Sequence, residues 1–263
     1  MQVDRRLAAR DTAALMETDR RPPLTLPSPP PLVAPGDFRE RLEEAGIALN
    51  PNALRPLGDY LARLLAMNEQ MNLTAIVDPV EAWERHIFDA LTLLPFIAEL
   101  PAGAKLVDVG SGGGVPGIPL AIARPDLQVT LVEATQKKAT FLSMVARALG
   151  LKNVQVVAER AEQLGQGALG GRFDVVTARA VGRLVALVPL VAPFARVGAL
   201  LLLIKGQRAD EELAEATEAI EAAQLAHELT VETPTGRIVI FHREEGDDEE
   251  PRPRAKGRRG RGR

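Results

Sequence analysis

The sequence predicts an α/β fold with a mostly parallel sheet and helices on both of its faces. From Lys105 onward, short apolar runs alternate with segments of helix length, a pattern typical of such a sheet. A chain of 263 residues with 46% hydrophobic residues can bury one sizeable core. We therefore expect one α/β domain, preceded by a small helical module.

Six strands and four helices are expected after residue 101. Six apolar runs are expected to form strands: residues 105–109, 128–133, 154–159, 173–178, 199–205 and 236–242. The segments between them are expected to form helices: residues 116–123, 136–149, 181–193 and 209–223.

A helical module is expected before the sheet. One amphipathic helix is predicted by leucines that recur at helical spacing, namely Leu54, Leu57, Leu61, Leu64 and Leu65. A second helix is expected to begin after Asp78, with Pro79 in its first turn, and to run to Leu94. We therefore place the helical module at residues 37–100 and the α/β domain at residues 101–243.

The two ends of the chain have a different composition. Residues 1–36 are polar and then proline-rich, which predicts a disordered extension. Residues 244–263 join an acidic block to an Arg/Gly-rich tail and are also expected to be disordered. Such a tail either follows RNA phosphates or only keeps the protein in solution.

The composition excludes several classes of protein. The chain has no cysteine, which excludes disulfides, iron–sulfur clusters and thiolate nucleophiles. It has no run of roughly 18 apolar residues, as a membrane-spanning helix requires, and its first residues lack the apolar core of a signal peptide. We expect a cytoplasmic protein without a membrane partner. The net charge of −3 argues against a uniformly basic nucleic-acid binder.

A glycine-rich loop follows the first expected strand and precedes a helix. This order is typical of folds that bind a cofactor containing a nucleoside, because glycine lets the backbone turn sharply and approach the ligand. Gly112, Gly114 and Gly117 fit a dinucleotide fingerprint. Asp108, Gly110, Gly112 and Gly114 fit the pattern of methyltransferases, which begins with an acidic residue. The spacing alone leaves both cofactor classes open.

Acidic residues at strand ends favour the methyltransferase interpretation. Asp108 ends the first strand, where it can hold the region around a bound aminoacyl group. Glu133 ends the next strand, where a carboxylate can bind ribose hydroxyls, although NAD enzymes share this placement. Ala161 and Glu162 follow the third strand, where they either contact an adenine edge or form an ordinary exposed loop.

Basic residues are expected near the same edge of the sheet. Arg179 ends the fourth strand, where its guanidinium can bind a cofactor carboxylate or an RNA phosphate, or pair with a nearby carboxylate. Lys205 ends the fifth strand and is similarly placed for phosphate. Arg85 and His86 share a predicted helix with Asp89, so they either form a local ion pair or contact RNA.

One further helix carries basic residues. Lys137, Lys138 and Arg147 form a basic face that is either a phosphate track for RNA or a solvated surface. No metal site is expected, and a lone His86 is not a metal ligand.

A set of short motifs in a fixed order resembles one protein family. The motifs are Asn68, Asn72-Leu73-Thr74, Arg85-His86, Asp89, DVGSGGGVPGIPLA, EATQKKATFL, RAEQL, TARA and LIKGQ. Their order and spacing resemble the bacterial 16S rRNA guanine-N7 methyltransferases, formerly called glucose-inhibited division protein B. The resemblance covers about residues 40–243.

This resemblance implies a fold, a cofactor and a substrate. The implied fold is a Rossmann-like class I methyltransferase with a seven-stranded, mostly parallel sheet. The implied reaction uses S-adenosyl-L-methionine, releases S-adenosyl-L-homocysteine and methylates N7 of a guanine in 16S rRNA, guanine 527 in the family. The partner is the free 16S rRNA or a small ribosomal subunit particle, and we expect a monomer.

The resemblance also assigns residues to the cofactor. It places contacts at Gly110, Val115, Ala161, Glu162 and Arg179. The residues assigned on physical grounds join them: Asp108, Gly112 and Glu133.

The expected chemistry requires no general base. Guanine N7 carries a lone pair and no proton, so it can attack a sulfonium methyl group directly when it is held in line. No catalytic residue is therefore certain, and Arg179 and Lys205 are candidates for positioning the reactants. Two alternatives stay open: a methyltransferase of another RNA, a protein or a small molecule, and a non-catalytic RNA-binding factor of ribosome assembly.

Overall fold

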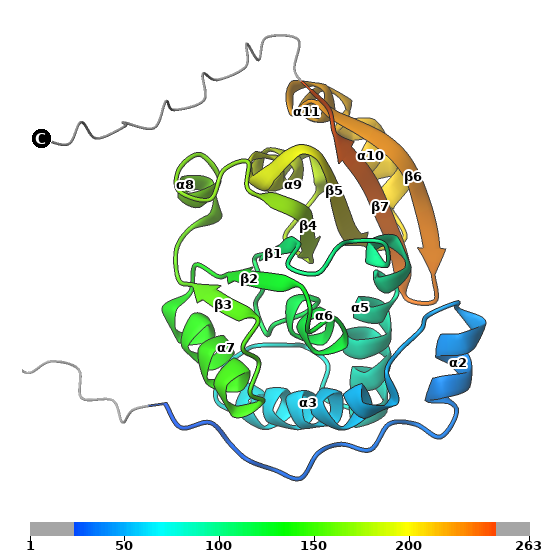
Figure 1. Cartoon of the computed structure of the whole chain (residues 1–263), viewed down its shortest axis with the longest axis vertical. Helices are drawn as coiled ribbons and strands as arrows, with labels where there is room; N and C mark the ends of the chain where they lie inside the picture. The colour runs from blue at the N-terminus through cyan, green and yellow to red at the C-terminus, as the bar shows by residue number, and fades with distance from the viewer. Residues whose placement is uncertain (1–23, 246–263) are drawn as a thin grey trace, which may run out of the picture.

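A computed structural model describes residues 24–245, which form a seven-stranded sheet with helices on both faces (Figure 1). The strand order is β3-β2-β1-β4-β5-β7-β6. Strands β1 to β5 pair in parallel, and β7 is antiparallel to both β5 and β6. The strands are β1 Lys105–Val109, β2 Gln128–Val132, β3 Val154–Val157, β4 Phe173–Arg179, β5 Ala195–Lys205, β6 Leu225–Thr233 and β7 Gly236–Arg243. The predicted α/β class is confirmed.

Strand β6 was not among the six apolar runs. It lies at the edge of the sheet, and of its nine residues only Leu225 is buried. A register shift between His227 and Leu229 also interrupts its pairing with β7. A solvated edge strand of this kind has no continuous apolar run, so the apolar pattern predicts only six strands. The family resemblance implies all seven.

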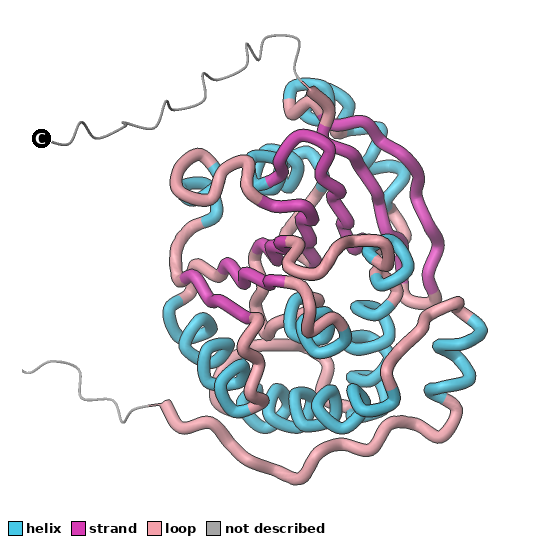
Figure 2. Tube along the Cα trace, in the orientation of Figure 1, coloured by secondary structure: helices cyan, strands magenta, loops and turns pink. Residues whose placement is uncertain are grey.

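Alternate strand residues divide the core into two layers. Leu106 and the residues of the other strands that point to the same face pack against the helical module, α6 and α7. Val107 and the strand residues that point to the opposite face pack against α8 to α11. Figure 2 shows the helices on both sides of the strands. These helices are α6 Gly117–Ala123, α7 Gln136–Ala148, α8 Ala161–Gly165, α9 Leu184–Val191, the 3₁₀ turn η4 Ala192–Phe194, α10 Ala209–Glu215 and α11 Thr217–Ala222. The single helix expected at residues 209–223 is thus two helices that meet at Ala216.

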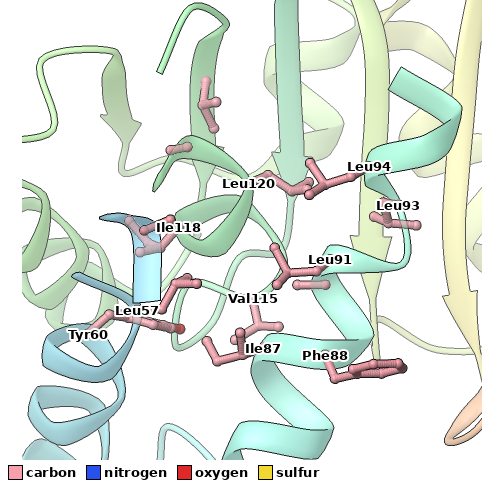
Figure 3. Close-up of a cluster of buried hydrophobic side chains, with 14 of the residues drawn as sticks. Leu57, Tyr60, Ile87, Phe88, Leu91, Leu93, Leu94, Val115, Ile118 and Leu120 are labelled. Carbon is pink, nitrogen blue, oxygen red and sulfur yellow. The ribbon is translucent and has the colours of Figure 1, made fainter. Parts of the chain in front are cut away.

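The helical module shares its apolar core with the sheet. Figure 3 shows Leu57 and Tyr60 of α3 and Ile87 of η2 beside Val115 of the glycine-rich loop and Ile118 of α6. The module therefore packs directly against the glycine-rich loop. Its elements are α2 Phe38–Glu44, the 3₁₀ turns η1 Pro51–Ala53 and η3 Leu94–Ile97, α3 Leu54–Asn68, α4 Pro79–Ala82, the π-helical turn η2 Trp83–Phe88 and α5 Asp89–Leu91.

Residues 24–36 correct the prediction of a disordered N-terminal extension. They run as an extended strap along the helical module, and Leu24, Leu26, Leu32 and Ala34 pack against its core. The Leu32 amide donates to the carbonyl of Gly58 in α3 at 3.1 Å. The prediction was wrong for this part because prolines favour an extended backbone that can lie flat on a neighbouring helix. Residues 1–23 and 246–263 lie outside the described part.

In the part of the chain that the structure describes, no helix is both long and apolar enough to cross a membrane.

The close contact between α3 and the strap predicts the effect of one substitution. A Cβ on Gly58 would lie 2.1 Å from the Leu32 carbonyl oxygen and 3.3 Å from the Trp83 ring. Gly58→Ala should displace the strap and lower the free energy of unfolding by about 1–2 kcal/mol, even after the gain from alanine's helix propensity. Urea unfolding measures this change. Gly36→Ala is the control, because a Cβ there meets nothing within 4 Å, and equal midpoints for both variants would contradict the prediction.

Candidate functional site

The loop between β1 and α6 turns sharply at three glycines. Gly110, Gly112 and Gly114 have φ values of 73°, 55° and 103°, which L-residues with a side chain rarely adopt. The amides of Gly110 and Ser111 both donate to the Val132 carbonyl at the end of β2, at 2.9 and 3.0 Å. The loop therefore folds back over the edge of the sheet between β1 and β2.

Asp108 supports this loop from within the protein. Its side chain is fully buried, and Oδ2 accepts the Gly117 amide at 3.2 Å while Oδ1 accepts the Thr177 hydroxyl at 3.2 Å. A Cβ on Gly117 would lie 2.9 Å from Oδ2 and 2.3 Å from Leu131, so only glycine fits there. Burial raises the pKa of Asp108 to about 6, although its hydrogen bonds oppose this shift. Asp108 does not line the cavity described below, so it acts on the loop rather than on a ligand.

Glu133 binds the same loop from the end of β2. Its Oε2 accepts the Gly112 amide at 2.9 Å, and Oε1 accepts the Thr135 amide at 2.7 Å. The side chain is buried but lines the cavity. A carboxylate has about four acceptor positions, so Glu133 can still accept hydrogen bonds from a ligand.

A cavity of about 330 Å³ lies beside the loop, within the usual size range of ligand sites. Its lining residues are Leu64, Leu73, Thr74, His86, Gly110, Ser111, Gly112, Gly113, Val115, Glu133, Lys138, Arg179, Ala180 and Val181. A Cβ on Gly112 would meet no protein atom closer than 3.8 Å, so the space beside it is open to a ligand. A larger cavity of about 440 Å³ lies beside α2, but its lining is mainly apolar and lies away from the loop.

Tyr60 is a residue of the site that the sequence analysis missed. It is fully buried in α3, and its hydroxyl donates to the Gly113 carbonyl at 2.9 Å. Burial raises its pKa far above the usual value, so the hydroxyl stays protonated. The leucine stripe predicts that this helix packs on its neighbours but not which side chain reaches the loop. The one available signal was that Tyr60 is the only tyrosine in the chain.

Arg179 lies in the cavity wall and is bound by the helical module. Its Nη2 is 2.9 Å from His86 Nδ1, and its Nη1 donates to the Arg85 carbonyl. Asp89 Oδ2 lies 3.8 Å from Nη1. Burial lowers the pKa of Arg179, but a guanidinium keeps its charge in proteins. The expected pairing with a carboxylate is therefore present, and the side chain also faces the cavity.

The structure corrects the expectation that His86 contacts RNA. The side chain is 2% exposed, and both ring nitrogens are within hydrogen-bond distance of protein atoms, namely Arg179 Nη2 and Thr74 Oγ1. Burial, reinforced by the nearby Arg179 charge, lowers the pKa of His86 to about 4. The local ion pair with Arg85 is not formed either, because Asp89 pairs with Arg179. Burial raises the pKa of Asp89 to about 6, and Arg85 itself is exposed.

Lys205 is not available to a phosphate in this structure. Its ammonium lies 2.8 Å from Glu212 Oε2 and also donates to the Gly182 carbonyl. The side chain is only 7% exposed. The ion pair links the end of β5 to α10, so the structure favours the structural role for Lys205 over phosphate binding.

The remaining predicted residues are only partly brought together. Lys138 lines the cavity near Glu133, whereas Lys137 and Arg147 are exposed elsewhere on α7. Ala161 is buried and Glu162 exposed at the start of α8, and neither lines the cavity. Within residues 24–245, no group of three or more His, Cys, Asp or Glu side chains is placed to hold a metal ion.

Comparison with protein families supports the methyltransferase interpretation of the glycine loop. The model of one family, described as rRNA small subunit methyltransferase G, matches residues 53–239, which is more than half of the chain. The chain belongs to this family.

Individual relatives agree with this assignment. The chain is 62% identical over 238 residues to the ribosomal RNA small subunit methyltransferase G of Sorangium cellulosum strain So ce56, covering 90% of this chain and 99% of the relative. It is 40% identical over 191 residues to the protein of the same name from Streptococcus pyogenes serotype M12, strain MGAS9429, covering 72% and 80%. The family is thus shown over the helical module as well as the sheet.

A solved structure shows the same fold at low sequence identity. A geranyl diphosphate methyltransferase in complex with GPP and sinefungin aligns with a TM-score of 0.50 and 18% identity, covering 79% of this chain and 94% of that chain. The Rossmann-like class I methyltransferase fold predicted from the sequence is confirmed.

The buried carboxylate under the loop predicts a pH dependence of stability. The folded pKa of Asp108, about 6, exceeds its ordinary value of 3.8, so the folded state binds this proton more tightly than the unfolded state. Its contribution to stability is complete below pH 3.8 and is lost as the pH rises through about 6. Asp108→Asn cannot titrate, so from pH 4 to pH 7 the wild type should lose on the order of 2 kcal/mol relative to the variant.

Urea unfolding of the wild type and Asp108→Asn at several pH values measures this difference. Because both proteins contain the other titrating groups, including Asp89 and His86, those contributions cancel in the comparison. A difference that does not change between pH 4 and pH 7 would show that Asp108 is ionised equally in both states.

Proposed function

We propose that this protein transfers a methyl group from S-adenosyl-L-methionine to N7 of a guanine in 16S rRNA, the substrate that the family resemblance implies. Membership in the rRNA small subunit methyltransferase G family supports an rRNA substrate of the small subunit. The observation that carries the proposal is the cavity in which the glycine loop, Glu133 and Arg179 meet. It offers backbone, anionic and cationic groups in one place.

The residues of this cavity fit the proposed cofactor. Glu133 is placed to accept hydrogen bonds from ribose hydroxyls, and the open space at Gly112 admits a ligand close to the backbone. Arg179 is a fixed cation in the wall and suits the carboxylate of an aminoacyl group. Ala161 and Glu162 remain the proposed contacts for an adenine ring. When bound, S-adenosyl-L-methionine supplies an electrophilic methyl group on its sulfonium.

The groups around the cavity favour a substrate atom that needs no deprotonation. Asp108 binds the loop, and Asp89 lies beside Arg179. Both ring nitrogens of His86 are engaged with other side chains. Asp108 and Asp89 do not line the cavity, so neither is placed to accept a proton from a substrate there, and His86 has no free ring nitrogen. Guanine N7 has a lone pair and no proton, so the protein contributes by orienting N7 toward the methyl group.

Four basic residues are the proposed contacts for RNA. Lys138 lines the cavity and Arg85 lies exposed on η2, beside the segment that binds Arg179. Lys137 and Arg147 are exposed elsewhere on α7 and are proposed as further RNA contacts. We place the protein in the cytoplasm with the small ribosomal subunit and expect it to act as a monomer. His86 and Lys205 are not proposed as RNA contacts.

The first experiment is a methyl-transfer assay with the full chain. The protein is incubated with methyl-labelled S-adenosyl-L-methionine and with unmodified small-subunit rRNA, both as free RNA and as particles. We expect the label at a single guanine, where chemical cleavage specific for 7-methylguanine locates it. Label at another atom or in another molecule would overturn the guanine-N7 assignment, and cofactor binding without any label would favour the non-catalytic alternative.

Glu133→Ala tests the cofactor site separately. The substitution removes a charged acceptor whose hydrogen bond is worth roughly 1.5–3 kcal/mol, so the dissociation constant for S-adenosyl-L-methionine should rise by about 10- to 150-fold. Isothermal titration calorimetry measures this constant. Glu159→Ala is the matched control, because Glu159 is an exposed glutamate after the neighbouring strand. Unchanged affinity in Glu133→Ala would remove Glu133 from the proposed site.

A further inference from the structure

A chain of hydrogen bonds leads from the helical module to Arg179. Asn68 Oδ1 accepts the amides of Leu73 and Thr74, at 2.8 and 2.9 Å, and so fixes the turn after α3. Thr74 Oγ1 lies 2.8 Å from His86 Nε2, and His86 Nδ1 lies 2.9 Å from Arg179 Nη2. The His86 ring therefore bridges this turn and the cavity wall.

The donors available on Arg179 set the direction of these hydrogen bonds. A guanidinium has only donors, so His86 Nδ1 must accept from Arg179 and cannot carry a proton. The proton of the neutral ring is then on Nε2, which donates to Thr74 Oγ1. The same oxygen also accepts the Ile76 amide at 3.0 Å, so Thr74 accepts both hydrogen bonds, while Arg179 sets the tautomer.

The contacts on Arg179 come from one short segment. Nη1 donates to the Arg85 carbonyl and Nη2 to the ring of the next residue, His86. Both residues lie in the π-helical turn η2, and such turns are frequent at functional sites. Two adjacent residues thus hold two nitrogens of one planar group, which fixes how the guanidinium lies in the wall.

We infer that His86 is a positioning residue for methyl transfer: its Nδ1 orients Arg179 toward the cavity, and Thr74 holds the ring in place by accepting the Nε2 proton. This inference rests on the role that the proposed function gives to Arg179. It assigns His86 no contact with RNA or with the reacting atoms, in agreement with its burial. The helical module thereby contributes to the orientation of a group at the end of β4.

Nitrogen-15 NMR tests the tautomer without any activity measurement. The chain contains three histidines, and the other two, His227 and His242, can each be substituted to assign the signals. At neutral pH we expect His86 to show a protonated Nε2 and an unprotonated Nδ1, and Arg179→Ala, which removes the donor to Nδ1, to change this pattern. A proton on Nδ1, or a doubly protonated ring, would overturn the inference.

Two substitutions of His86 separate orientation from packing. The side-chain carbonyl of asparagine can replace Nδ1 as an acceptor, whereas the amide of glutamine reaches the position of Nε2 and leaves Arg179 without this acceptor. His86→Gln should therefore lower kcat by roughly 10- to 100-fold, and His86→Asn by only a few-fold. The KM for RNA should stay unchanged in both. Thermal unfolding shows whether each variant is folded.

The outcomes distinguish this inference from the proposed function. If Arg179→Ala is inactive but His86→Gln keeps full activity, the role of His86 is wrong and the function stands. If His86→Asn loses more activity than His86→Gln, the contact with Thr74 matters more than the contact with Arg179, and the inference is overturned. If Arg179→Ala keeps full activity, the role proposed for Arg179 fails, and that of His86 fails with it.

Discussion

The site depends on the hydrogen bonds that hold the backbone of one glycine-rich loop. Asp108 in β1 accepts a hydrogen bond from the amide of Gly117, and Glu133 at the end of β2 accepts one from the amide of Gly112. Tyr60 adds a third bond from the helical module, to the Gly113 carbonyl. A glycine loop has many accessible conformations, and fixing it costs conformational entropy. Buried polar partners on three sides select one conformation of the loop beside the cavity.

The helical module is part of the site rather than an addition to the fold. It supplies Leu64, Leu73, Thr74 and His86 to the cavity wall, while the sheet supplies the loop and Arg179. Aromatic packing holds two of its own elements together, since the rings of Phe38 in α2 and Trp83 in η2 meet edge to face with centroids 5.0 Å apart. Changes in this module should therefore alter the cavity even when no residue in the sheet changes.

Sequence order explains which features could be predicted. The glycine loop and Glu133 belong to a strand–loop–helix pattern confined to a few dozen residues, so the sequence alone predicts them. The contacts of Tyr60 with Gly113 and of His86 with Arg179 join residues 53 and 93 positions apart. Lys205 illustrates the same limit, because its position at a strand end suggests an anion site, whereas its partner Glu212 is known only from the packing of α10. The sequence pattern places a residue on a helix or strand, but it does not show which distant residues its side chain contacts.

The surroundings of Arg179 show how a half-buried cation can stay available to a ligand. Burying a guanidinium without a countercharge is expensive, and Asp89 supplies that charge. Yet Asp89 lies 3.8 Å away, too far for a hydrogen bond to Nη1. The close partners are neutral acceptors, the Arg85 carbonyl and the His86 ring. A bidentate carboxylate would neutralise the guanidinium, whereas neutral acceptors hold it in place and leave its charge directed to the cavity. This difference gives a reason for a histidine at position 86, since an acidic residue there would compete with any anionic ligand.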